Sequence, residues 1–567
     1  MNISKTVLLL SALLFLYCES KTESEIITIS HIKSAEKIFG IEFNPTERDS
    51  LIDGVRDNLA NYQALREWSL DNSVVPALQF NPIPVGARYD SIQSPLEFSP
   101  MQPVQRPADL KDIAFWSVRQ LSELIRTRQV TSLELTTLYL ERLKRYGPSL
   151  ECVVTLTEEL ALEQARKADE EIAAGTYRGH LHGIPYGAKD LLTKKNYKTT
   201  WGAMPYKDQV IDSDAAVIKK LEDAGAVLVA KLTMGALAWG DVWFGGKTRN
   251  PWNLEEGSSG SSAGPGSATA AGLVGFSIGT ETWGSIVSPS TRNGVTGLRP
   301  TYGRVSRTGA MALSWSMDKI GPMGRTVEDC ALVFNAIYGP DSIDQTLVDL
   351  PFNYDHAVDF NNLVIGYLDA AFNEDYPNKE QDSLTLEILR TLGANLVPIT
   401  LPEYLVENLA FILSAEAAAA FDDLTRSGDD DLLVRQIKNA WPNEFRMSRF
   451  IPAVEYIQAN RVRYQLIQGM EAFMQTVDLY IAPSFGGDNL LRTNLTGHPC
   501  VVLPNGFNEE GSPVSISFIG RLFDEGTILA VANAYQRATA WHLQHPDLDV
   551  NIAAFETSKI KGGGEEQ

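Results

Sequence analysis

The sequence predicts an α/β fold, and three observations support this prediction. Amphipathic helical segments alternate with short apolar runs that suit buried strands, and glycine stands at many of the joints. The chain has 567 residues, enough for one very large domain or several ordinary ones. Hydrophobic residues make up 44% and charged residues 21% of the chain, which is typical of a soluble globular protein.

Changes in composition divide the chain into four regions. We expect an export or lipoprotein-type signal, a helical N-terminal arm that continues into a proline-rich wrapping segment, a large main domain and a polar C-terminal tail. In this order the regions are residues 1–24, 25–108, 109–549 and 550–567.

The first region resembles an export signal. Lys5 supplies a positive charge, an apolar stretch over residues 7–17 follows, and Cys18 opens a polar run. The stretch is too short to span a bilayer. A cysteine at this place resembles the lipidated residue of bacterial lipoproteins, so we expect an exported protein of the cell envelope or periplasm, with a lipid anchor at Cys18. Tyr17 is bulkier than the residue usual before such a cysteine, and an ordinary cleaved signal is the alternative.

Charge and cysteine usage exclude several classes of protein. The net charge of -22 and the pI near 4.8 make nucleic acid and acidic lipid surfaces poor partners. Cys152, Cys330 and Cys500 are too widely spaced for a disulfide framework or a metal site. The histidines are scattered and form no metal-binding motif, so we expect neither a metal nor another cofactor.

The arm is expected to contain two helices followed by an extended segment. Apolar residues recur at helical spacing over residues 30–39 and 45–68, and Asn44 followed by Pro45 is typical of a helix start. Residues 75–107 are rich in proline and show no periodicity, so we expect an ordered crossing along the main body.

The main domain is expected to begin near Asp109 and to alternate between helices and strands. Helices are expected over residues 117–127, 132–146, 158–174, 214–224, 234–239 and 526–543, with a nearly all-helical stretch over 401–463. Strands are expected over residues 153–156, 182–189, 226–230, 362–369, 395–397, 479–483, 501–503 and 514–518.

A stretch rich in small residues, over residues 257–301, is the most informative part of the chain. Glycine and serine dominate its beginning, yet a mostly apolar run over 268–278 interrupts it, whereas a flexible linker stays polar. We therefore expect a small-residue loop, a buried helix over 267–272, a buried strand over 273–278 and a second tight loop. Backbone N–H groups in such loops can hold an anion, which suggests an acyl-transfer site.

Three motifs in this stretch and one before it resemble those of the amidase signature family. Residues 259–264 (SGSSAG) correspond to GGSSGG, residues 279–286 (GTETWGSI) to GTDTGGSI, and residues 297–301 (GLRPT) to GLKPT. Residues 182–190 (HGIPYGAKD) match the upstream lysine motif. The resemblance implies a large mixed twisted β-sheet surrounded by helices, over about residues 109–549.

The resemblance also implies a catalytic triad of two serines and a lysine. Ser285 matches the acyl-accepting serine, Ser261 the bridging serine on a cis peptide bond, and Lys189 the base. Among the serines of the first loop, Ser261 keeps the offset to Ser285 that the family has. The implied oxyanion hole consists of the backbone N–H groups of four consecutive residues, Thr282, Trp283, Gly284 and Ser285.

The implied chemistry is physically coherent. Amide hydrolysis needs a nucleophile, a proton acceptor, a proton donor for the leaving amine and a cradle for the oxyanion. A lysine serves as the acceptor only when burial lowers its pKa from about 10.4, and residues 182–187 are apolar enough to bury Lys189. Taken alone, Lys189 could be an ordinary ion-pair partner of Asp190 or of another carboxylate, and the Ser/Gly loop a simple turn. Their joint occurrence favours a site.

Four positions depart from the family pattern. Trp283 replaces a glycine, and its ring is expected either to lie against the acyl pocket as a gate, which we favour, or to pack into the core. Glu281 replaces an Asp and Val287 replaces a common Arg, so we expect the ion pair that those two positions often form to be absent. Pro265 stiffens the loop after Ser261.

Other catalytic and nucleotide-binding motifs are incomplete. Residues 246–248 (GKT) match the last three positions of a Walker A motif, but Asp241 stands where the first glycine of that motif belongs. Gly264 starts like a dinucleotide-binding loop, but Thr269 stands where its third glycine belongs. We see no support for a Ser-His-Asp triad in the sequence.

The function that fits best is hydrolysis of a linear carboxylic amide, other than a peptide bond, through an acyl-enzyme on Ser285 and without a cofactor. The alternative within the family is the amidotransferase component that passes glutamine-derived ammonia to charged tRNA. Export would separate the chain from that tRNA. A catalytically silent envelope binding protein on the same scaffold is the rival from another class, and the retained triad argues against it. The expected partner is a small-molecule amide rather than nucleic acid, and a homodimer is left open. Pocket residues are expected over 402–450 and 492–499.

Overall fold

The computed structural model describes residues 27–67 and 70–562. The predicted export signal and the lipid anchor at Cys18 lie outside these described residues. The chain falls into two compact units, and the boundary between them lies between Asp71 and Asn72. Within the described residues, every helix is too short or too polar to cross a lipid bilayer.

The first unit contains two helices at the places where helical spacing predicted them. Helix α1 spans Ile29–Phe39 and helix α2 spans Pro45–Arg66. The Asn44 side chain accepts a hydrogen bond from the Glu47 N–H at 3.0 Å, and the Glu47 carboxylate accepts one from the Asn44 N–H at 2.6 Å. This reciprocal cap stabilises the start of α2.

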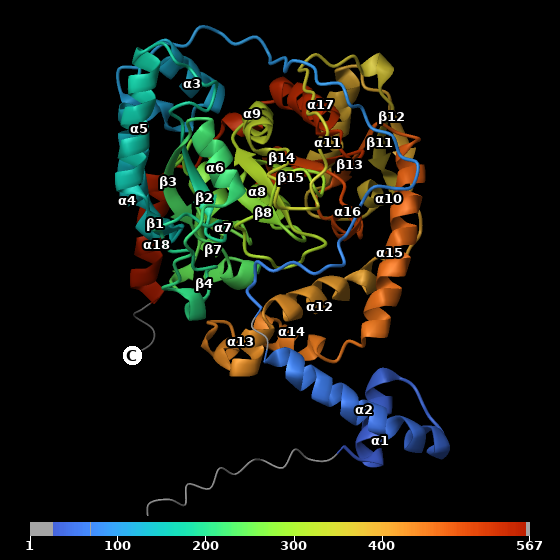
Figure 1. Cartoon of the computed structure of the whole chain (residues 1–567). Coiled ribbons are helices and arrows are strands. Elements are labelled where there is room, and N and C mark those ends of the chain that lie inside the picture. Colours follow the sequence, from blue (N-terminus) through green and yellow to red (C-terminus); the bar gives the residue numbers. More distant parts are fainter. Residues whose placement is uncertain (1–26, 68–69, 563–567) are drawn as a thin grey trace, which may run out of the picture. The chain divides into compact units, whose positions relative to one another are not determined.

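The second unit is built on one sheet of eleven strands (Figure 1). The strand order is β1-β3-β2-β8-β10-β9-β14-β15-β13-β11-β12. The strands are β1 (Val153–Leu156), β2 (Pro185–Lys189), β3 (Val227–Leu232), β8 (Phe276–Glu281), β9 (Thr296–Arg299), β10 (Lys319–Gly324), β11 (Ile365–Leu368), β12 (Leu396–Ile399), β13 (Leu479–Pro483), β14 (Cys500–Phe507) and β15 (Pro513–Gly520). Two small hairpins lie apart from the sheet, β4 (Val242–Trp243) with β5 (Gly246–Lys247) and β6 (Arg249–Asn250) with β7 (Asn253–Gly257).

The sheet is mixed. Strand β2 pairs in parallel with β3 and β8, and β11 pairs in parallel with β12 and β13. The pairs of β10 with β8 and β9, of β14 with β9 and β15, of β13 with β15 and of β1 with β3 are antiparallel. The predicted α/β class with a large mixed sheet is therefore confirmed.

Helices surround this sheet. They are α3 (Val118–Arg126), α4 (Ser132–Leu150), α5 (Glu158–Ala173), α6 (Ala216–Asp223), α7 (Ala263–Ala270), α8 (Val287–Asn293), α9 (Val327–Ile337), α10 (Asp369–Asn373), α11 (Lys379–Thr391), α12 (Phe411–Ala420), α13 (Asp422–Ser427), α14 (Trp441–Ser448), α15 (Ala453–Met474), α16 (Asn489–Thr496), α17 (Glu525–Ala538) and α18 (Leu548–Gly562). Figure 1 shows α4 and α5 beside the β1 end of the sheet and α10 near β11 and β13.

Both faces of the sheet are buried, as strand β14 illustrates. Val501 and Leu503 pack in one hydrophobic cluster with residues of α9 and α17. Cys500 and Val502 pack in another cluster with residues of α8 and α16. Since successive side chains of a strand point to opposite faces, α9 and α17 cover one face and α8 and α16 the other.

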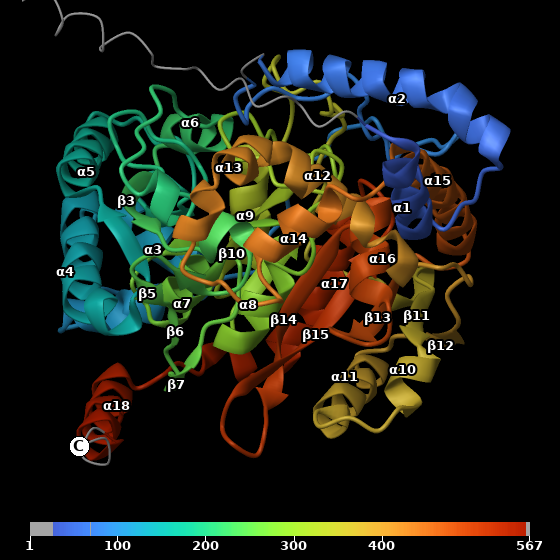
Figure 2. The ribbon, with the colours of Figure 1, turned by 90° about the horizontal axis from the view of Figure 1, so that it is seen from below.

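Several elements differ from the sequence prediction. Strands β1 and β13 have the predicted bounds, but residues 401–463 are divided among α12, α13, α14 and α15, with a non-helical stretch over 433–440. The view from below shows α12, α13 and α14 side by side (Figure 2). Strands β9 and β10 and helix α9 were not predicted, because α9 is buried almost all round and glycine or proline interrupts the strand patterns.

The C-terminal residues, where a polar tail was expected, form helix α18 as far as residue 562. Leu548 and Phe555 are buried in a cluster that also contains residues of α4, and Ile552 packs against it. The spacing of these three residues places them on one side of the helix.

The proline-rich segment belongs to the second unit and lies along it. The Asn72 side chain accepts a hydrogen bond from the Ala312 N–H at 2.7 Å. Further along, Glu97 donates its N–H to Tyr354 O at 2.8 Å and accepts from the His356 N–H at 2.9 Å. Residues 72–107 contain no helix.

Candidate active site

Lys189 is the last residue of β2, the middle strand of the parallel group β3-β2-β8. All five residues of β2 are buried, because β3 and β8 pair with it on either side and helices cover both faces. The Lys189 side chain is inaccessible to solvent. The strand predicted over 182–189 is thus shorter at its start but ends at the predicted lysine.

The Lys189 amine is surrounded by hydroxyl and carbonyl oxygens. Its Nζ donates hydrogen bonds to Ser261 Oγ at 2.8 Å and to Ser262 Oγ at 3.1 Å. It also contacts Thr280 Oγ1 at 2.8 Å and Thr280 O at 3.3 Å. Burial lowers the pKa of Lys189 to about 7, although the carboxylates of Asp318 and Glu281 act in the opposite direction.

Asp190, the neighbour of Lys189, has a different cation as its partner. Lys231 of β3 donates to Asp190 Oδ1 at 2.8 Å, and both side chains are fully buried. Thr200 donates its N–H to Asp190 Oδ2 at 2.8 Å. The reading of Lys189 as an ordinary partner of Asp190 is therefore wrong, because successive residues of the chain point their side chains in different directions. No carboxylate lies within ion-pair distance of Lys189 in the described part of the chain.

The loop before α7 presents Ser261 to Lys189. The peptide bond between Gly260 and Ser261 is cis, and the Ser261 side chain is almost fully buried. Gly260 lies so close to the neighbouring backbone of Gly240 that a Cβ at position 260 would stand 1.8 Å from Gly240 O. Glycine is therefore required at position 260, since any side chain would push this loop away from Lys189.

The other serines of the loop have structural hydrogen bonds. Ser262 Oγ donates to Thr280 O at 3.0 Å and accepts from the Thr280 N–H at 3.1 Å, which ties the loop to β8. Ser259 Oγ lies 2.7 Å from Ser288 Oγ, and Ser258 Oγ donates to Ser259 O at 3.0 Å. Ser261 and Ser262 are the two that reach Lys189.

Ser285 lies in the turn between β8 and α8. The Ser262 N–H donates to Ser285 O at 3.2 Å, so the Ser261 loop and this turn are joined directly. The Ser285 hydroxyl makes no hydrogen bond to any other described residue, and 8% of the residue is exposed. The structure thus brings Lys189, Ser261 and Ser285 into one cluster, in which hydrogen bonds link the lysine to Ser261 and the two loops to each other.

Glu281 closes the turn that carries Ser285. Its Oε2 accepts hydrogen bonds from the Ile286 N–H at 2.8 Å and the Val287 N–H at 2.9 Å. Its Oε1 accepts from Arg299 at 2.8 Å and from the Asn494 amide at 2.8 Å. Burial alone would favour the neutral acid, but the Arg299 guanidinium and these donors hold the pKa of Glu281 at about 2.

The ion pair that positions 281 and 287 form in the family is absent, as expected, but Glu281 has another cation as its partner. Val287 does remove the partner that the family has there, but Arg299 at the end of β9 supplies another, and both charged side chains are fully buried. The Arg299 guanidinium also donates to Thr493 Oγ1 at 2.9 Å and to His498 O at 3.0 Å. Residues 489–496, part of which was expected to be a pocket loop, form helix α16 and support this buried pair.

The four residues expected to form an oxyanion hole are arranged around a glycine turn. Gly284 has a φ of +82°, which favours glycine. The backbone N–H groups of Trp283, Gly284 and Ser285 donate no hydrogen bond to any described residue, so they are free to bind an anion. Thr282 is fixed through its side chain, whose Oγ1 donates to Asp318 Oδ1 at 2.5 Å.

Trp283 is not a core residue, since 46% of its surface is exposed. The alternative that its ring packs into the core is therefore wrong. An exposed indole beside the turn of Ser285 leaves the gate as the remaining prediction.

Several residues around the site were missed by sequence reasoning. They are Thr280, Arg299, Asn494 and Asp318, and each acts through a contact with a residue distant in the sequence. Recognition of β10 in the sequence would have placed Asp318 directly before a strand. This strand was not recognised, because it contains Gly and Pro and shows no alternation of polar and apolar residues. No group of His, Cys, Asp or Glu in the described residues is arranged to hold a metal ion.

Comparison with known proteins gives consistent matches. The family model described as Amidase matches residues 134–491. The A subunit of glutamyl-tRNA(Gln) amidotransferase from Roseiflexus sp. (strain RS-1) is 34% identical over 477 residues, covering 76% of this chain and 97% of that protein. Its counterpart from Methylococcus capsulatus is 33% identical over 478 residues, covering 76% and 98%. The X-ray structure of native peptide amidase from Stenotrophomonas maltophilia superposes with a TM-score of 0.68 at 29% identity, covering 77% of this chain and 100% of that one.

Proposed function

The chain belongs to the amidase signature family, and from this premise we propose that it hydrolyses a linear carboxylic amide through an acyl-enzyme on Ser285. One observation carries the proposal. The buried amine of Lys189, with a pKa lowered to about 7, lies 2.8 Å from Ser261 Oγ and has no carboxylate partner among the described residues. A lysine in such surroundings is neutral often enough near neutral pH to accept a proton.

The proposed reaction begins with proton transfer along two hydroxyls. Ser261 passes its proton to the neutral Lys189 amine and takes the proton of Ser285, whose Oγ attacks the amide carbon. The negative charge that develops on the carbonyl oxygen is stabilised by the free N–H groups of residues 283–285. The protons then return by the same path to the leaving nitrogen, the C–N bond breaks, and the acyl group stays on Ser285.

Water completes the cycle by the same chemistry. It attacks the acyl carbon, and its proton passes through Ser261 to Lys189. The proton then returns through Ser261 to the Ser285 oxygen as the ester C–O bond breaks and the carboxylic acid forms. Ser261 and Ser285 are not hydrogen-bonded to each other here. Catalytic hydrogen bonds are often longer in a free enzyme and shorten when the substrate is bound.

A fluorophosphonate probe combined with an amide screen tests this proposal. Ser285→Ala is expected to abolish both probe labelling and amide hydrolysis without changing the melting temperature, because it removes one hydroxyl that makes no hydrogen bond to any described residue. The control is Ser290→Ala on the adjacent helix α8, since the Ser290 hydroxyl is buried and also lacks a partner among the described residues. The control should label and hydrolyse like the wild type. Labelling of the Ser285→Ala variant would place the nucleophile elsewhere, with Ser261 the first alternative.

The curated relatives favour a second candidate function. They are components of glutamyl-tRNA(Gln) amidotransferase, so this chain could act on the glutamine amide and deliver ammonia within a complex. The two candidates differ in what the isolated chain does. Turnover of several simple amides by the purified chain supports the hydrolase, whereas activity restricted to glutamine that rises when partner subunits are added supports the amidotransferase. A chain that neither labels with the probe nor turns over either class of substrate would support the silent binding protein.

A further inference from the structure

Asp318 lies next to the turn that carries Ser285, although it is distant in the sequence. Strand β10 pairs antiparallel with β8, and Lys319 is opposite Glu281. Continuing this register by one residue places Asp318 opposite Thr282, at the point where β8 ends and the turn begins.

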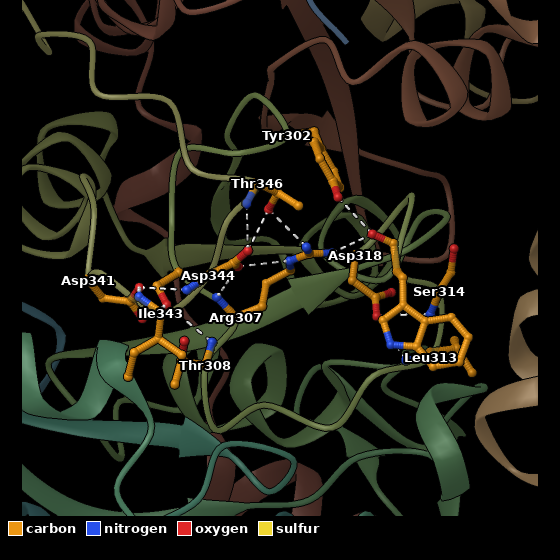
Figure 3. Close-up of polar contacts among 12 residues, drawn as sticks. Tyr302, Arg307, Thr308, Leu313, Ser314, Asp318, Asp341, Ile343, Asp344 and Thr346 are labelled. Carbon is orange, nitrogen blue, oxygen red and sulfur yellow. Dashed lines mark hydrogen bonds and ion pairs between the residues drawn. The ribbon is translucent and has the colours of Figure 1, made fainter. Parts of the chain in front are cut away.

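The Asp318 carboxylate is bonded to donors alone. Oδ1 accepts a hydrogen bond from Thr282 Oγ1 at 2.5 Å. Oδ2 accepts from the Leu313 N–H at 2.8 Å and from the Ser314 N–H at 2.9 Å, and Figure 3 shows these groups around it. Three donors and no acceptor match the ionised form of the carboxylate, even though burial raises its pKa.

The loop that holds Asp318 is itself anchored from behind. Trp315 O accepts hydrogen bonds from Tyr302 at 2.7 Å and from Arg307 at 2.6 Å. Arg307 in turn pairs with Asp344, at 3.2 Å (Figure 3). Residues 313–318 therefore form a fixed platform, and Thr282 is the element of the active-site turn that is bonded to it.

We propose that Asp318 is a positioning residue of the amide hydrolysis proposed above. Its carboxylate holds Thr282 in place through a hydrogen bond, so that the N–H groups of residues 283–285 point at the site of the oxyanion. Its negative charge also stabilises protonated Lys189. The inference rests on the proposed function, because it assigns a role within the same site.

Both parts of this role have a physical basis. Thr282 is the residue before the three free N–H groups, so rotation of its backbone would move all of them. Donors must be placed before the reaction to stabilise an oxyanion, and a misplacement of about 1 Å can cost about 10²-fold in rate.

The charge acts on Lys189 together with three other groups. Glu281 of β8 also raises the pKa of Lys189, Arg307 lowers the pKa of Asp318, and Lys319 follows Asp318 on β10. Burial lowers the pKa of Lys319 well below its usual value. Of the carboxylates, Asp318 has the larger effect in raising the pKa of Lys189. Its neutralisation is therefore expected to lower the pKa of Lys189 further.

The test is the rate of fluorophosphonate labelling, measured against probe concentration and against pH on the full chain. Thr282→Val should lower the maximal labelling rate about 10- to 10²-fold with little change in half-saturating probe concentration, and Thr282→Ser should restore it to within a few-fold. Asp318→Asn should lower the rate similarly and also move the rise of rate with pH to lower pH. A matched control is Asp344→Asn, which removes the carboxylate partner of Arg307 and should lower the melting temperature without moving the pH profile.

Two results would overturn the inference while leaving the proposed function intact. One is a wild type that labels while Thr282→Val labels equally fast. The other is an Asp318→Asn variant whose pH profile coincides with that of the wild type. If Asp318→Asn does not fold, the Thr282 pair decides the positioning role alone. A wild type that neither labels nor hydrolyses any amide would overturn the proposed function and this inference with it.

Discussion

Lys189 has its lowered pKa because of what surrounds it. The residue is the end of a strand that two parallel neighbours and two layers of helix remove from water. Its hydrogen-bond partners are the hydroxyls of Ser261, Ser262 and Thr280 and one carbonyl, which can accept from an amine but cannot balance a full positive charge. Lys231, by contrast, is equally buried but is paired with Asp190. The two lysines are equally buried and differ in whether a carboxylate is within ion-pair distance.

Replacement of Lys189 tests this assignment through stability as well as activity. The pKa of Lys189 in the fold, about 7, lies below its usual value of 10.5, so between these pH values the fold binds fewer protons than the unfolded chain. Stability associated with Lys189 thus rises with pH across this window and is lowest below pH 7. Lys189→Met should abolish hydrolysis and raise the melting temperature, with a larger gain at pH 6 than at pH 9.5. Scanning calorimetry at the two pH values measures this.

The matched control is Lys231→Met, which leaves the Asp190 carboxylate buried without its cation. This variant should lower the melting temperature at both pH values. Equal gains for Lys189→Met at both pH values would contradict a lowered pKa.

Trp283 can be tested separately because it is exposed. Trp283→Gly should change the melting temperature little, since a ring with 46% of its surface exposed leaves no core cavity, whereas a buried aromatic cut to a small residue costs about 3–5 kcal/mol. If the ring narrows the acyl pocket, the variant should hydrolyse amides with longer or bulkier acyl groups better than the wild type. Rates for a series of amides of graded acyl length measure the change. An unchanged ranking of these amides would rule out the gate.

At the scale of elements, the site is made where two strands end. Strand β2 ends at Lys189 and its parallel neighbour β8 ends at Glu281, so the loops that follow them meet at one edge. The Glu281 carboxylate bonds the start of α8 and Arg299 of β9 at once. The buried pair therefore holds β8, β9 and α8 in the arrangement that shapes the turn of Ser285.

Arg299→Met tests the importance of this pair. The substitution leaves the Glu281 carboxylate buried without its cation, which is expected to cost about 3–5 kcal/mol of unfolding free energy. The control is Arg292→Met on α8, because Arg292 pairs with Glu256 at the surface with 46% of its side chain exposed, and a surface pair contributes about 0–1 kcal/mol. Urea denaturation measures both. A loss for Arg299→Met no larger than that for Arg292→Met would show that Asn494 and the backbone donors suffice.

At the scale of the whole molecule, the net charge and the expected cellular location bear on the choice between the candidate functions. A net charge of -22 disfavours direct binding of tRNA, so an amidotransferase role would require partners that bind it. The export signal and lipid anchor expected in residues 1–24 lie outside the described residues and stay predictions. We propose that the protein is exported and anchored through Cys18, and this address would favour the hydrolase.

The address can be tested with the full chain. If Cys18 is lipidated, the native protein should partition into the detergent phase of Triton X-114, and Cys18→Ser should move it to the aqueous phase, because acyl chains supply the affinity for detergent. Mass spectrometry of the mature N-terminus is the second measurement. A native protein in the aqueous phase that begins at another residue would instead support an ordinary cleaved signal.

The sequence by itself determined the family and the α/β class, and it is the source of the three residues proposed as a triad. These follow from contiguous motifs, since Lys189, Ser261 and Ser285 each stand in a short run of residues that can be recognised without knowledge of the rest of the chain. Short apolar runs were also predictable as strands, as β1 and β13 show. Helix α9 was not, because a helix buried on nearly all sides has no polar face to give a period.

Only the tertiary structure decided which charged and polar groups are paired. Val287 suggested that Glu281 had lost its cation, yet Arg299 reaches it from another strand. In the same way Asp190 is paired with Lys231, and Thr282 is bonded to Asp318. Hydrophobic periodicity determines which face of an element is buried, but it does not determine which ends of distant strands meet. A buried charge must be paired with whatever partner is within reach there, and that partner is set by the packing of the whole sheet.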